Sequence, residues 1–156
     1  MKRKLFTLVA ILFINLIVIG QNLFIIGDKS CPCTNAIVLI SNSDEDNNLE
    51  VFICKNGKSG LIGLNKKTSL NADITNKLNI YLVDGSVLIC TEKVAAENVD
   101  DDAKALYNLT ADQLNKLRAS NIHTVKYSMT WLSELTFSAS NKGIETREII
   151  NEFFKE

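Results

Sequence analysis

Two tight-turn sequences constrain the fold of this chain more than any other feature. Asn56-Gly57 separates the apolar runs 49–55 and 58–64, and Asp84-Gly85 lies inside the apolar stretch 78–93. Asn-Gly and Asp-Gly pairs accept the positive φ angles of type I′ turns, which join neighbouring antiparallel strands. We therefore predict two β-hairpins.

The second hairpin is apolar on both faces. A two-residue turn at Asp84-Gly85 sets Leu82 opposite Val87. The same register sets Ile80 opposite Ile89 on the same face. The other face has Tyr81, Val83, Leu88 and Cys90. Strands that are apolar on both faces lie inside a sheet, so we expect this hairpin at the centre.

A capped helix follows the two hairpins. In "NLTADQLNKLRASN" Thr110 is the N-cap and Gln113 completes a capping box, while Leu109 can pack on Leu114. Asn121 accepts the backbone conformation of a helix end. This pattern predicts a helix that begins after Thr110 and ends near Ser120.

Two connecting segments have weaker patterns. Leu70, Ile74 and Leu78 have the i, i+4, i+8 spacing of a helical turn or two. The segment 94–107 is interpreted as a loop with some helix, and Asp100 to Asp102 as a solvated bend.

The last third of the chain has the pattern of a third hairpin and a final helix. Strands are predicted over 122–129 and 134–140, and the end of the chain, 141–156, has a helical apolar stripe at Ile149, Ile150, Phe153 and Phe154. The order ββ-ββ-α-ββ-α predicts an α+β domain, a mostly antiparallel sheet of hairpins with two main helices packed on one face.

The N-terminus has the pattern of a secretory signal peptide over residues 1–20. Lys2, Arg3 and Lys4 precede an apolar run, and Val18 and Gly20 have the small-residue spacing of a cleavage site. The alternative is an uncleaved anchor that extends to residue 27. Both place the remaining chain outside the cytoplasm, periplasmic or extracellular.

The segments "YLVDGSVLIC", "LTADQLNKLRASNIHTVKYSM" and "NKGIETREIINEFFKE", in that order behind a signal peptide, resemble small exported bacterial α+β proteins to which no activity can be attached. The resemblance implies a fold and an envelope location, and no catalytic residue. We divide the chain into the signal segment 1–20, an N-terminal segment 21–48 and a single domain 49–156.

Four cysteines in an exported chain indicate disulfides. Pro32 favours an extended Cys31, which puts the Cα atoms of Cys31 and Cys33 about 6.6 to 7 Å apart, at the upper limit for a disulfide. We therefore expect these two cysteines to be bonded to Cys54 and Cys90, in either order. The alternative is that Cys31 and Cys33 form a working thiol pair, redox-active or binding a soft metal such as Cu(I).

The catalytic inventory is thin. His123 is the only histidine, and no H-E-x-x-H, G-x-S-x-G or phosphate-binding glycine motif occurs. We expect no cofactor and no resident metal, and enzymatic activity is not favoured.

The residue best suited to contact a partner is Trp131, in the predicted turn of the third hairpin. Without the three basic residues of the signal segment, the 17 basic and 18 acidic residues leave a net charge of about −4, which excludes nucleic acid as the partner. The expected partner is a protein or another envelope component, and a membrane only where the N-terminal segment stays uncleaved. An inhibitor or immunity-type protein is one version of this hypothesis.

Overall fold

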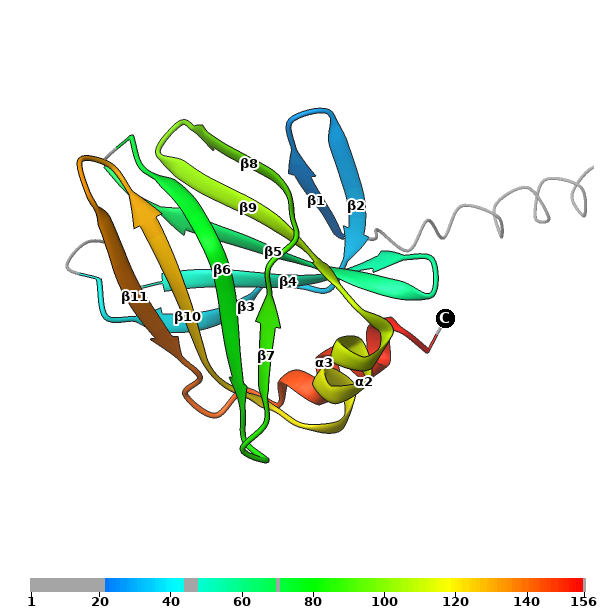
Figure 1. Cartoon of the computed structure of the whole chain (residues 1–156). Helices are drawn as coiled ribbons and strands as arrows, with labels where there is room; N and C mark the ends of the chain where they lie inside the picture. Colours follow the sequence, from blue (N-terminus) through cyan, green and yellow to red (C-terminus); the bar gives the residue numbers. More distant parts are fainter. Residues whose placement is uncertain (1–21, 44–47, 70, 156) are drawn as a thin grey trace, which may run out of the picture.

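The computed structural model describes residues 22–43, 48–69 and 71–155, and the predicted signal segment lies outside these residues. Strands and two short helices make up the described fold (Figure 1). In chain order the elements are β1 (Asn22–Ile26), β2 (Lys29–Cys33), β3 (Ile37–Ser41), β4 (Asn48–Asn56), β5 (Ser59–Lys67), β6 (Asp73–Leu82), β7 (Val87–Cys90), β8 (Lys93–Val99), β9 (Asp102–Leu109), α2 (Ala111–Ala119), β10 (Ile122–Thr130), β11 (Glu134–Ser140) and α3 (Thr146–Phe153).

Nine of the strands form one antiparallel sheet in the order β7-β6-β10-β11-β3-β4-β5-β9-β8. The sheet curls into a nearly closed barrel (Figure 1). The two ends of the sheet, β7-β6 and β8, approach each other. Hydrogen bonds of side chains join them: Lys93 on β8 donates to the Ile74 carbonyl of β6 at 3.3 Å, and Asn98 on β8 donates to the Ala72 carbonyl at 2.6 Å. The β1–β2 hairpin lies outside the barrel and pairs with β4.

Alternating apolar residues of the strands fill the barrel. Ile37 and Leu39 of β3, and Val51 and Ile53 of β4, are fully buried in the main core. The next residue, Cys54, points to the opposite face of the sheet, where a smaller cluster packs beneath the β1–β2 hairpin. The barrel wall between Ile53 and Cys54 therefore separates two hydrophobic cores.

The two helices lie together at one end of the barrel (Figure 1). Arg118 of α2 and Asn151 of α3 exchange two hydrogen bonds, of 2.9 and 2.8 Å. Leu114, Leu117 and Ile150 extend the main core under this end. The predicted capping box of α2 is confirmed, with Thr110 and Gln113 bonded reciprocally.

The structure corrects the predicted order of elements. Residues 73–82, expected in part as helical turns, form β6. Residues 94–107, expected as a loop with some helix, belong to the β8–β9 hairpin. Asp100 and Asp101 make its turn with positive φ angles of 53° and 64°. The sequence has no Asn-Gly or Asp-Gly pair at this turn, so the signal that marked the first two hairpins is absent here. The class stays α+β in broad terms, with strands dominant and the helices at the barrel end.

The register of the β6–β7 hairpin is also corrected. Tyr81 pairs with Val87, one residue away from the predicted Leu82–Val87 pair. The connection is longer than two residues, because the Leu82 amide donates to the Ser86 carbonyl at 2.9 Å. A shift of one residue exchanges the faces of a strand, so Val87 and Ile89 are exposed. The hairpin forms one end of the sheet, with β7 last in order, and is not central.

Candidate functional site

An apolar pocket opens beside the β10–β11 turn. This turn lies at the end of the barrel away from the helices (Figure 1). The volume of the pocket is approximately 270 Å³. Its lining residues are Ser43, Lys66, Thr68, Ala72, Met129, Trp131, Leu132, Ser133, Leu135 and Phe137. They come from β5, β10 and β11 and from the β3–β4, β5–β6 and β10–β11 connections, so the pocket exists only in the folded barrel.

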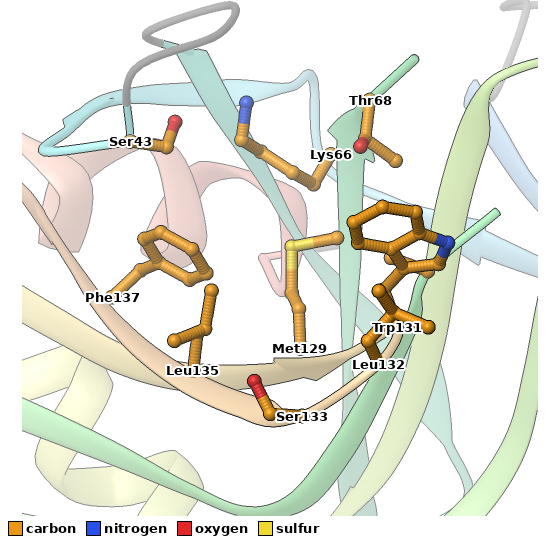
Figure 2. A pocket seen from close by; sticks show the side chains of 10 residues that line it. Ser43, Lys66, Thr68, Met129, Trp131, Leu132, Ser133, Leu135 and Phe137 are labelled. Carbon is orange, nitrogen blue, oxygen red and sulfur yellow. The ribbon is translucent and has the colours of Figure 1, made fainter. Parts of the chain in front are cut away.

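The turn that borders the pocket presents large apolar side chains to solvent. Trp131 is 54% exposed, Leu132 82% and Leu135 57%. The strand register places Leu135 opposite Met129 on β10, and the Trp131 amide donates to the Ser133 carbonyl at 3.5 Å. Figure 2 shows the side chains of Met129, Leu135 and Trp131 around one space. Trp131, predicted as a contact residue, thus lies at the edge of a pocket.

Lys66 gives the pocket wall a buried positive group. Its side chain is 1% exposed, and its ammonium donates to the Lys67 carbonyl at 3.0 Å. Figure 2 shows it reaching over the apolar side chains from β5. Lys66 was not among the residues predicted from the sequence. The available signal was the alternation along β5, in which Ile62 and Leu64 face inward and position 66 follows with the same parity.

The cysteines fall into two groups, and all four are thiols in the structure. Cys33 on β2 pairs in register with Cys54 on β4, and both are buried in the smaller core. Cys31 is half-buried at the edge of the same cluster, and it lines a hollow on the protein surface. Cys90 belongs to the main core inside the barrel. The structure brings three of the four predicted site cysteines together and leaves Cys90 apart.

The pair Cys33 and Cys54 titrates as a unit. A hydrogen bond from the Cys54 side chain lowers the pKa of Cys33. The same hydrogen bond, burial and the nearby Cys33 and Cys31 raise the pKa of Cys54 far above its usual range. Burial raises the pKa of Cys90 to about 11. Of the two thiols, Cys33 is therefore the one with the lower pKa.

His123 lies on the barrel surface. It is exposed at the start of β10, and its Nδ1 lies 2.9 Å from the hydroxyl of Thr124. Within residues 22–43, 48–69 and 71–155, no three His, Cys, Asp or Glu side chains are grouped so that they could hold a metal ion.

Neither α2 nor α3, the helices of the described part of the chain, has the length and apolar character needed to cross a membrane. No family model, no curated protein and no solved structure matches this chain.

Proposed function

We propose that this protein is an exported, disulfide-stabilised, non-enzymatic binding module of the cell envelope, which recognises a partner protein through the Trp131 turn and the pocket beside it. The observation that carries the proposal is the exposure of Trp131, Leu132 and Leu135 around an apolar hollow. Exposed, ordered aromatic and aliphatic side chains that surround a pocket are the usual anchors of protein interfaces. The signal-type sequence over residues 1–20 supports the exported location.

The size of the pocket favours an apolar side chain as its occupant. Its volume of approximately 270 Å³ exceeds the roughly 150 Å³ that is enough for benzene, and lies just below the range of roughly 300 to 1,000 Å³ typical of drug-sized ligands. One aromatic or aliphatic side chain of a partner fits this space, while Trp131 and Leu132 cover the surface around it. An inhibitor or immunity-type protein would use such a site to bind a secreted enzyme.

Site-specific photo-cross-linking in the producing cell tests this proposal. A photoreactive amino acid at Leu132 is expected to give a defined adduct with one envelope protein, because this side chain is 82% exposed at the site. The same amino acid at Val83, which is exposed near the β6–β7 turn, is the matched control. The identified partner is then purified, and its affinity for the wild-type chain and for Trp131→Ala is measured by calorimetry.

The two outcomes are separable. A loss of affinity of roughly tenfold or more for Trp131→Ala, with Val83→Ala unchanged, supports recognition at the turn. Adducts that are equal at both positions, or a partner whose affinity does not depend on Trp131, contradict it.

Thiol redox chemistry is a second candidate, supported by the position of Cys31 beside the buried pair Cys33 and Cys54. The sequence predicts bonds from Cys31 and Cys33 to Cys54 and Cys90, or else a working Cys31–Cys33 thiol pair, and the strand register has Cys33 opposite Cys54. The reduction potential distinguishes the two functions. A structural bond has a potential below about −300 mV, and a catalytic or regulatory pair a higher one. Equilibration in glutathione buffers, followed by alkylation of free thiols, measures it.

A further inference from the structure

The side chains of Cys33 and Cys54 occupy the close kind of cross-strand position. The two residues face each other where β2 meets β4, and the amide of Thr34 donates to the Ile53 carbonyl at 3.0 Å. In an antiparallel pair this hydrogen bond lies beside a non-hydrogen-bonded pair, whose Cα atoms are about 4.5 Å apart. That separation lies inside the range of a disulfide, about 4.4 to 6.8 Å.

The surroundings of the two sulfurs favour the same bond. Both side chains are buried in the smaller core, and the two residues face each other across the β2–β4 pair. The Sγ of Cys33 also lies 3.4 Å from the carbonyl oxygen of Cys31 and 3.6 Å from that of Asn22. Both contacts lie within the β1–β2 hairpin, to which Cys33 itself belongs.

The other two cysteines are placed differently. Cys90 lies in the main core, and the wall of the barrel separates it from Cys54, since Ile53 faces the interior and Cys54 faces outward. Cys31 precedes Cys33 by two residues on an extended strand, which puts their Cα atoms about 6.6 to 7 Å apart. Neither Cys31 nor Cys90 is as well placed for a disulfide with Cys33 or Cys54 as these two are with each other.

We infer that Cys33 and Cys54 form a single cross-strand disulfide in the exported protein, while Cys31 and Cys90 remain thiols. The oxidant is a disulfide of another thiol compound or protein. Two S–H bonds of the chain are broken and one S–S bond is formed. The S–S bond of the oxidant is broken, and its sulfurs take up the two electrons and two protons.

The bond would secure the outer hairpin to the barrel. The ladder between β2 and β4 consists of one residue pair, Cys33 with Cys54. The remaining attachments of the hairpin include the packing of Phe24 on the smaller core and a 2.7 Å hydrogen bond from the Gly27 amide to Glu97. A covalent link at the single bridge fixes the hairpin where its ladder is shortest. This inference is independent of the recognition site at Trp131.

Mass spectrometry of the full chain, recovered from an oxidising compartment with thiols blocked at lysis, tests the inference. Trypsin alone leaves Cys31, Cys33 and Cys54 in one peptide, because the next cleavable bonds follow Lys29 and Lys55. Trypsin with Glu-C separates them into peptides 30–45 and 51–55, and places Cys90 in 78–92. The expected product is the linked pair 30–45 and 51–55, which separates on reduction, with Cys31 and Cys90 alkylated.

Peptide 30–45 contains both Cys31 and Cys33, and two variants together with fragmentation of the linked peptide show which of them is bonded to Cys54. Cys31→Ser keeps the link, and Cys33→Ser abolishes it. If Cys33→Ser does not accumulate, fragmentation of the wild-type pair on either side of Pro32 makes the assignment alone. The inference is overturned by wild-type protein in which Cys33 and Cys54 are both alkylated, or in which either is linked to Cys31 or Cys90.

Discussion

The ring of Phe24 lies directly on Gly63, and a Cβ atom at residue 63 would come within 3.0 Å of two ring carbons. Gly63 is on β5, in the barrel wall, and Phe24 is on β1 of the outer hairpin. A separation of 3.0 Å is tighter than nine in ten real Cβ contacts, so a side chain at residue 63 would force the Phe24 ring to shift by a few tenths of an ångström. At Gly63 the hairpin is attached to the barrel by the close packing of the Phe24 ring.

Gly63→Ala is therefore expected to destabilise the attachment of the hairpin. The added methyl overpacks the smaller core, which costs about 1 to 3 kcal/mol. Urea unfolding measures the loss, and hydrogen exchange is expected to increase in β1 and β2 first. In a Phe24→Ala background the cost of Gly63→Ala is expected to fall close to zero, because the ring is gone. An equal cost in both backgrounds would contradict this contact.

Substitutions at the pocket are expected to separate recognition from stability. Trp131→Ala is expected to change the free energy of unfolding by less than about 1 kcal/mol, since more than half of the side chain is exposed. Met129→Ala is expected to cost about 2 to 5 kcal/mol, because Met129 is buried in the main core. Chemical unfolding with circular dichroism measures both. A large loss of stability for Trp131→Ala would assign that residue to the core.

The capping box of α2 makes a local prediction. Thr110→Ala removes the acceptor of the 3.2 Å hydrogen bond from the Gln113 amide and is expected to cost about 1 kcal/mol. Thr110→Ser keeps an acceptor and serves as the matched control. Thermal unfolding compares the three proteins, and equal midpoints for Ala and Ser would show that the cap contributes nothing.

Tyr107 is expected to make stability fall at alkaline pH. Burial is the main cause that raises its pKa from 10.0 to about 12. Above pH 10 the unfolded chain loses this proton first, so the contribution of Tyr107 is complete below about pH 10 and is lost as pH rises towards about 12. The slope is measured by urea unfolding at several pH values, and Tyr107→Phe is expected to reduce it.

The same variant has a second expected effect at neutral pH. The hydroxyl of Tyr107 is buried without a hydrogen-bond partner among the described residues, so Tyr107→Phe is expected to be neutral or stabilising. Tyr127→Phe is the contrast, because the Tyr127 hydroxyl shares a 2.7 Å hydrogen bond with Ser41 and its loss costs about 1 kcal/mol. Equal effects of the two variants would contradict the assignment.

Reduction of the Cys33–Cys54 bond is expected to lower stability. Closing the loop between these residues contributes about 3 kcal/mol in the chain-entropy model, which corresponds to a fall of roughly 10 °C in the midpoint of thermal unfolding. Calorimetry with and without a phosphine reductant measures the change. In Cys54→Ala the reductant is expected to have no effect, and in Cys31→Ser the full effect. A reductant effect that persists in Cys54→Ala would assign it to other thiols.

Local signals in the sequence determined those elements whose stability depends on near neighbours in the chain. The capped helix after Thr110 is one, since its hydrogen bonds join residues three apart. The β4–β5 hairpin is another, since the Asn56-Gly57 signal lies at the turn that joins the two strands, where Asn56 pairs with Ser59.

Tertiary structure decided the features that depend on long-range pairing. A shift of one residue in the β6–β7 register put Val87 and Ile89 on the face opposite Ile80 and Leu82. Packing in the barrel also made residues 73–82 a strand between β7 and β10. Barrel closure also brought Lys66 and Trp131 to one pocket, and the outer hairpin brought Cys33 to Cys54. None of these pairs has a signature in local sequence, because the contacts form only when distant strands pack into the same sheet.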